Sequence, residues 1–229
     1  MNPGVNTDDL IRQLADANAP VRRLRPPWVR ALVWLAIAGP YVALVIWLHP
    51  HTPEIIASLA DMRMVVEIVA ALATGVTAAC AAFCSTVPGY DRRMLWLPVP
   101  PAALWAAMLG AGCLNDWLRY GVAALALRPD WDCLPPAILV GSLPLVAILV
   151  MLRRGAPLRP QISVALAALA VAGLGNAAMR LFHPGDATVM ILVWHVGIAF
   201  ALTALAGLLG KAVLSWRQAW ARAQPRGLA

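Results

Sequence analysis

Cysteines are the residues of this sequence with the clearest capacity for chemistry. Cys113 and Cys133 each fall at the end of an apolar segment, and a shorter, more polar stretch separates them. If the two segments are neighbouring antiparallel helices, these ends lie close together. A disulfide is then allowed once the two Cα atoms are within ~7 Å. As free thiols, the same side chains are ligands for a soft metal ion. The residues alone leave both states open.

The other cysteines and the histidines are weaker candidates. Cys80 and Cys84 lie four residues apart, on one face of a helix, and inside an apolar segment they are expected to pack as small hydrophobic side chains. A metal site would require a larger ligand set: Cys113, Cys133, His183 and His195. Their spacing contains neither C-x-x-C nor H-x-x-x-H. A hydrogen-bonding role is therefore favoured for the histidines. No resident cofactor is predicted, and a soft metal ion is considered only as a signal.

The elements that position these residues are predicted to be membrane-spanning helices. Apolar residues make up 61% of the 229 positions and charged residues only 13%, against about half and about a quarter in a soluble domain. A run of ~20 apolar residues crosses the hydrocarbon core, and it must be helical because lipid offers the backbone no hydrogen-bond partner. We predict an all-α integral membrane bundle of six transmembrane helices, at Ala31–Leu48, Met64–Val87, Met94–Cys113, Leu134–Leu152, Ile162–Phe182 and Thr188–Leu209.

The basic residues indicate the orientation of this bundle. Most of the 18 Lys and Arg residues lie in the N-terminal segment, the second and fourth connections and the C-terminal tail. Basic connections stay in the cytoplasm. Both termini are therefore predicted to be cytoplasmic, with a cytoplasmic segment at 1–30, a membrane domain at 31–210 and a basic tail at 211–229. The net charge of +7 is explained by this orientation, so nucleic acid is not predicted as a partner.

Residues 7–24 are predicted to form a short amphipathic helix in the cytoplasm. Thr7 is the expected N-cap, Asp8 and Asp9 suit the positive end of the helix dipole, and Pro20 interrupts the helix near its third turn. Such a helix either lies on membrane lipid or fills a groove on a cytoplasmic protein. The residues alone slightly favour lipid, since so short a helix is marginal unless it packs on something. Its apolar stripe consists of Leu10, Leu14, Ala17, Val21 and Leu24.

Two further patterns predict contacts inside the bundle. Glu67 and Arg180 are ionisable residues just inside predicted spans, where a charged group needs a partner. We predict that they pair, with Asn176 as a polar neighbour. The second span carries small residues at four-residue spacing, which allows a neighbouring helix to approach closely. These small residues are Ala71, Gly75 and Ala79, and Ala70, Thr74 and Ala78.

Several short segments of the chain resemble the NrsF family (negative regulator of sigma F). The first are Asn6-Thr7-Asp8-Asp9-Leu10-Ile11 and Pro20-Val21-Arg22-Arg23-Leu24. The others follow in order: Gly110-Ala111-Gly112-Cys113 with Asp116-Trp117, Arg128-Pro129-Asp130-Trp131-Asp132-Cys133, Arg153-Arg154-Gly155-Ala156-Pro157, Arg180-Leu181-Phe182-His183-Pro184, and Trp194-His195. The resemblance covers nearly the whole chain and includes the predicted layout of six spans.

This resemblance implies a multi-pass anti-sigma factor of the bacterial inner (cytoplasmic) membrane. Such proteins hold an extracytoplasmic-function sigma factor at the membrane and release it on a signal from outside. In the resembled family, paired outward-facing cysteines are linked to signal perception, and Cys113 and Cys133 match that pattern best; a static disulfide is the alternative. The resemblance implies sigma-factor contact by the N-terminal segment, through Asp8, Asp9, Leu10, Ile11, Leu14, Val21, Arg22, Arg23 and Leu24.

Two other functions fit the sequence less well. An integral thiol oxidoreductase commonly uses a C-x-x-C pair, and the sequence contains none. A small transporter is expected to show internal repeats and charged residues near the middle of its spans, and neither is found. No nucleophile–base arrangement, phosphate-binding loop or dinucleotide motif is present in the sequence. No enzymatic activity is predicted.

Overall fold

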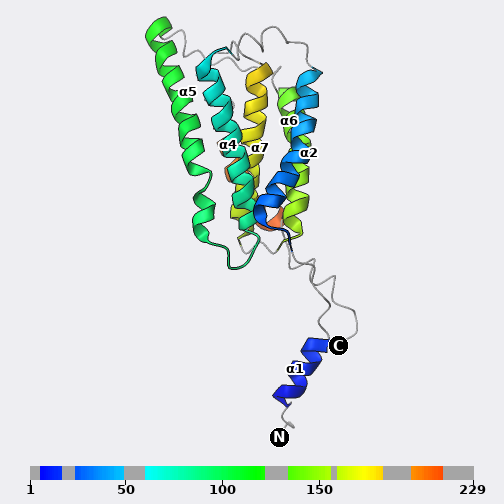
Figure 1. Ribbon diagram of the computed structural model, residues 1–229. Coiled ribbons are helices and arrows are strands. Elements are labelled where there is room, and N and C mark those ends of the chain that lie inside the picture. The colour runs from blue at the N-terminus through cyan, green and yellow to red at the C-terminus, as the bar shows by residue number, and fades with distance from the viewer. Residues whose placement is uncertain are drawn as a thin grey trace.

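The computed structural model describes residues 6–16, 24–48, 60–121, 134–155, 159–182 and 197–213, and these segments are predominantly helical (Figure 1). Within them the helices are α1 (Thr7–Asp16), α2 (Pro27–Trp47), α4 (Met62–Cys84), the short 3₁₀ helix η1 (Arg92–Trp96), α5 (Val99–Tyr120), α6 (Leu134–Arg153), α7 (Pro160–Phe182) and α9 (Ile198–Val213). The predicted all-α class is confirmed for the described residues, which contain no strand.

Among the residues that the structure describes, five helical segments are long and apolar enough to cross a membrane. They are Pro27–Trp47, Met62–Cys84, Arg92–Tyr120, Pro135–Arg153 and Pro160–Leu181. They coincide with the first five predicted spans, which is compatible with a membrane protein. The sixth predicted span, Thr188–Leu209, overlaps α9, which is 16 residues long in the described part of the chain. The sixth span, the cytoplasmic location of both termini and the domain limits remain predictions.

Helices α4 and α7 form the centre of the bundle (Figure 1). Helix α4 packs against α7, α5 and α2, whereas α7 also packs against α6 and α9. The main core lies between α2, α4, α6 and α7, with Trp34, Phe83 and Ile148 among its fully buried side chains. Helix α5 packs on the bundle mainly through α4, with Trp105 and Leu109 buried at that contact.

Small residues bring the backbones of α4 and α7 into direct contact, as the sequence predicts. A Cβ atom on Gly173 would lie 2.6 Å from the backbone nitrogen of Gly75 and 2.7 Å from the carbonyl oxygen of Ala71. On Gly75, it would lie 3.0 Å from the carbonyl oxygen of Ala170. Real Cβ atoms do not approach backbone atoms at less than 3.0 Å. Glycine is therefore required on α7 for this helix pair to pack as it does.

Prolines inside the helices do not end them. Pro40 lies within α2 and Pro144 within α6.

The indole Nε1 of Trp34 donates a hydrogen bond to the Pro144 carbonyl at 2.9 Å, and the Trp34 side chain is fully buried. Trp34 is therefore a core residue that ties α2 to α6, whereas Trp28 and Trp47, at the ends of α2, are exposed as expected for an interface.

Two local predictions about helix ends are wrong. The N-cap of α1 is Asn6 rather than Thr7: the Asn6 side chain accepts a hydrogen bond from the Asp8 amide at 3.2 Å, and Thr7 is already helical. Asparagine is as good an N-cap acceptor as threonine. The third span continues to Tyr120 and stops before Gly121, whose φ of +63° suits glycine. Cys113 therefore lies about two turns inside α5, not at its end.

Candidate functional site

Helix α1 is the described part of the predicted docking segment, and its apolar side chains are uncovered. It buries no residue, and Leu10, Ile11 and Leu14 expose from 45% to 60% of their surface. Figure 1 shows α1 apart from the bundle. Asp8 and Asp9 occupy its first turn, where negative charge stabilises a helix. We call Leu10, Ile11 and Leu14 the α1 stripe.

Several predicted site residues lie outside the described residues: Val21, Arg22, Arg23, Cys133, His183 and His195. Their roles remain predictions. Leu24 is described and exposed, but its predicted place in the amphipathic helix is wrong, because it lies in the non-helical residues that precede α2. In the parts of the chain that the structure describes, no three His, Cys, Asp or Glu side chains come together as a metal site. Three of the four predicted ligands lie outside these parts, so the sulfur and nitrogen ligand set stays a prediction.

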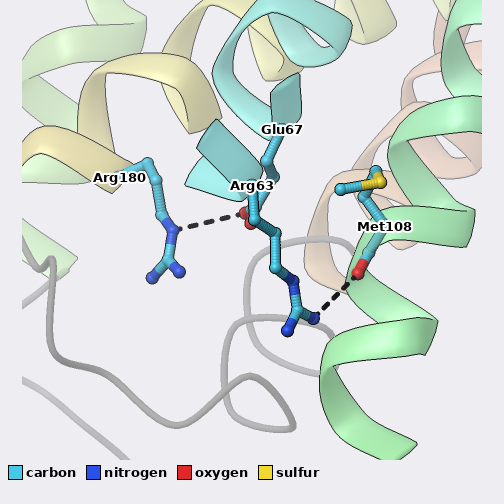
Figure 2. A network of polar contacts seen from close by, with 4 residues as sticks. All are labelled: Arg63, Glu67, Met108 and Arg180. Atoms are coloured by element: carbon cyan, nitrogen blue, oxygen red, sulfur yellow. Dashed lines mark hydrogen bonds and ion pairs between the residues drawn. The ribbon is translucent and has the colours of Figure 1, made fainter. Parts of the chain in front are cut away.

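One end of the bundle holds the predicted ion pair (Figure 2). The Nε atom of Arg180, near the end of α7, lies 3.4 Å from Oε1 of Glu67, near the start of α4. The pairing of Glu67 with Arg180 is thus confirmed. The Arg63 guanidinium, one turn before Glu67, donates to the carbonyl oxygen of Met108 on α5 at 3.3 Å. Asn176 donates to the Ala172 carbonyl of its own helix at 2.9 Å.

These contacts link three helices at one end of the bundle, which we call the Glu67 end. Glu67 and Arg180 are both largely buried, and a buried charge is retained only when it is paired or hydrogen-bonded. Arg63 attaches α5 to α4, while the ion pair attaches α4 to α7 (Figure 2). The position of α5 is therefore coupled through α4 to the rest of the bundle.

Cys113 lies on α5, beyond the residue to which Arg63 is bonded. It is a free, partly exposed thiol, five residues after Met108. The helix that carries it, α5, packs mainly on α4. Cys84 is buried and Cys80 is partly buried against the main core. Their surroundings agree with the predicted packing role.

The opposite end of the bundle contains a buried residue that sequence reasoning missed. Arg30 is 6% exposed, and its guanidinium donates to Oγ1 of Thr86 at 3.0 Å and to the Met151 carbonyl at 2.6 Å. Its Cζ atom lies 4.5 Å from the centre of the Phe83 ring, a favourable cation–π distance. In the sequence, Arg30 resembles the other arginines before the first span. Only the start of α2 at Pro27 places it inside a helix.

A family model described as negative regulator of sigma F (NrsF) matches residues 14–216. The chain belongs to the NrsF family. No curated protein and no solved structure matches it.

Membership in the NrsF family makes this chain a negative regulator of a sigma factor, that is, an anti-sigma factor, and a sigma factor is its partner. The family is a regulatory one. The NrsF match begins at Leu14, inside α1. It includes Leu14, the segment that leads to α2 and the whole bundle, whereas Asp8 to Ile11 precede it.

Proposed function

We propose that this NrsF-family protein is an inner-membrane anti-sigma factor that sequesters an extracytoplasmic-function sigma factor through its N-terminal segment. The observation that carries the proposal is the α1 stripe, three large apolar side chains that nothing in the described part of the chain covers. An isolated helix of 10 residues is marginal in water. A groove on the sigma factor would both cover the stripe and stabilise the helix.

The proposed orientation places the Arg30 end at the cytoplasmic side. The described connections at this end carry exposed arginines: Arg92, Arg93, Arg153, Arg154 and Arg159. The positive-inside rule favours the cytoplasm for such connections. The Glu67 end then faces outward, and Cys113 lies toward that side. A signal received there and a sigma factor bound to the N-terminal segment would occupy opposite aqueous phases.

Sigma-factor binding tests the proposal directly. The full chain, in lipid nanodiscs, is mixed in turn with each extracytoplasmic-function sigma factor of the same organism, and binding is measured by biolayer interferometry. We expect a saturable complex with micromolar affinity or tighter. The affinity should be equal in nanodiscs of neutral lipid and in nanodiscs of anionic lipid. Absence of a complex would refute the proposal. If the N-terminal segment instead associates with anionic lipid and binds no sigma factor, the membrane-surface alternative is correct.

The second part of the proposal is that Cys113 and Cys133 receive the signal. Oxidation of the thiols, or their ligation by a soft metal, would favour a different position of α5. A hundredfold loss of sigma affinity requires a coupling free energy of ~2.7 kcal/mol. Because α5 is attached mainly through α4, the new arrangement leaves most contacts of the bundle in place.

Serine variants separate sensing from sequestration. In Cys113→Ser and Cys133→Ser, we expect repression of the sigma-dependent promoter to persist, while induction by a thiol oxidant or a soft metal falls at least tenfold. The measurement is a promoter reporter with and without each inducer. Cys80→Ser is the matched control, since this thiol packs against the core, and it should respond as the wild type does. Full induction in both outer variants would contradict thiol sensing but not the anti-sigma role.

A further inference from the structure

Arg30 occupies the first turn of α2, where the docking segment enters the bundle. Helix α2 begins at Pro27, and the Arg30 amide makes the first backbone hydrogen bond of the helix, to the Pro26 carbonyl at 3.1 Å. Its side chain points into the bundle and is buried. Any constraint on the Arg30 side chain therefore acts on the first turn of α2.

The guanidinium is held by neutral groups from two other segments. Thr86 follows the end of α4, and Met151 lies in the last turn of α6. Among the described residues, no carboxylate lies within ion-pair distance of Arg30. A planar guanidinium offers several donors in a fixed geometry and a flat face for the Phe83 ring, whereas a lysine ammonium does not. The site is therefore specific for arginine.

The acceptor Thr86 is itself fixed by its neighbours. Its hydroxyl donates to the Phe83 carbonyl at 2.8 Å, and its side chain is fully buried. A Cβ atom on Gly155, just after α6, would lie 2.6 Å from the Thr86 Cβ. The ends of α4 and α6 thus converge on Thr86, and Arg30 joins the start of α2 to both.

Two prolines connect the first turn of α2 rigidly to the residues that precede it. Pro26, with φ −49° and ψ 144°, is extended, and Pro27 is the first residue of α2. The proline ring restricts φ, and a following proline restricts the residue before it. Residues 24–26 therefore leave the bundle in a direction set by the first turn of α2. A change of that turn redirects the residues that precede it.

We propose that Arg30 is a positioning residue that sets the placement of the sigma-docking segment by tying the first turn of α2 to the ends of α4 and α6. This inference rests on the proposed function. Helix α4 also carries Arg63 and Glu67 at the opposite end of the bundle. A displacement of α4 at the Glu67 end also moves Phe83 and Thr86 at its other end. Because both contact Arg30, the first turn of α2 and the docking segment before it move as well.

The test compares Arg30→Gln and Thr86→Val with the wild-type full chain in nanodiscs. Arg30→Gln removes the charge and the paired donors, and Thr86→Val removes one acceptor while the residue keeps its shape. We expect the affinity for the sigma factor to fall about tenfold in Arg30→Gln, or ~1.4 kcal/mol, and about threefold in Thr86→Val. Amide hydrogen exchange of residues 30–33, the first amides of α2 that are hydrogen-bonded within the helix, should become faster in both variants.

Trp34→Phe is the matched control, one turn further along α2. It removes the hydrogen bond from Trp34 to the Pro144 carbonyl, and so weakens the α2–α6 contact away from the docking segment. We expect its thermal stability to fall at least as much as that of Thr86→Val, with sigma affinity within twofold of the wild type. This difference separates positioning from general stability of the bundle.

The outcomes distinguish the inference from the function on which it rests. If the wild-type chain binds no sigma factor, the proposed function fails and the inference fails with it. If the wild type binds and both Arg30→Gln and Thr86→Val bind equally well, the positioning role alone is overturned. Equal loss of affinity in Trp34→Phe would also overturn it, because stability would then account for every variant. If Arg30→Gln does not fold, the comparison of sigma-factor affinity between Thr86→Val and Trp34→Phe decides the question.

Discussion

Replacement of both Leu10 and Leu14 by glutamine is expected to abolish sequestration of the sigma factor. The two leucines lie one turn apart on the same face of α1 and are exposed in the structure. Complete burial of one leucine contributes ~1.5–3 kcal/mol, so loss of both from a filled groove costs ~3–6 kcal/mol. This corresponds to at least a hundredfold weaker complex. A promoter reporter should rise to the level of a strain that lacks the anti-sigma factor.

Arg12→Gln is the matched control for this double variant. Arg12 lies on the face of α1 opposite Leu10 and Leu14, and its replacement leaves the apolar side chains in place. We expect its reporter output to stay within about twofold of the wild type. Normal repression by the Leu10→Gln/Leu14→Gln variant would show that the α1 stripe is not the contact. The amount of each variant in the membrane is measured in the same cells. We expect equal amounts, because neither variant changes the bundle.

Substitution of Gly173 by alanine is the second change with a large expected effect, in this case on stability. Its new Cβ would lie 2.6 Å and 2.7 Å from backbone atoms of Gly75 and Ala71. Backbone atoms cannot rotate away as a side chain does, so α4 and α7 must separate. Overpacking of this kind costs ~1–3 kcal/mol, and we expect the upper part of this range. Thermal unfolding of the purified protein in detergent measures the loss.

Gly110→Ala is the control, because it makes the same chemical change on α5. A Cβ atom there has no neighbour within 4 Å. Alanine is favoured over glycine in a helix by ~1 kcal/mol, so this variant should be unchanged or slightly more stable. If Gly173→Ala and Gly110→Ala unfold at the same temperature, the close contact between α4 and α7 is not a determinant of stability.

Gly173→Ala also bears on the proposed route from the Glu67 end to Arg30, because α4 connects the two ends of the bundle. The ion pair between Glu67 and Arg180 attaches α4 to α7 at one end, and Gly75 contacts Gly173 further along the same pair. At the other end, Phe83 and Thr86 contact Arg30. Helix α4 is thus held against α7 along its length, and a small displacement of it acts on both ends.

The spans and one buried pair could be predicted from the sequence because they depend on local chemistry. Hydrocarbon admits only apolar helices of sufficient length, so five predicted spans coincide with described helices. Glu67 and Arg180 could be paired in advance because each would be costly in lipid without a partner. Leu10 and Leu14 of the α1 stripe were predicted from their helical spacing, whereas Ile11 was not part of that predicted spacing.

Helix ends were predicted less well because polar residues do not always end a helix. Asn115, Asp116 and Arg119 interrupt the apolar run of the third span, yet all three lie within α5. At the edge of a membrane these side chains are readily solvated while the backbone hydrogen bonds continue. Cys113 therefore lies inside a helix that the apolar pattern alone ended too early.

Only the tertiary structure decided which helices meet and what Arg30 does. Small residues on the second span indicated that a neighbour approaches closely, but not that the neighbour is Gly173 on α7. Arg30 looked like one more arginine of the N-terminal segment, and its acceptors come from residues 56 and 121 positions away. Hydropathy is a property of each segment by itself, whereas a contact depends on how all the helices pack together.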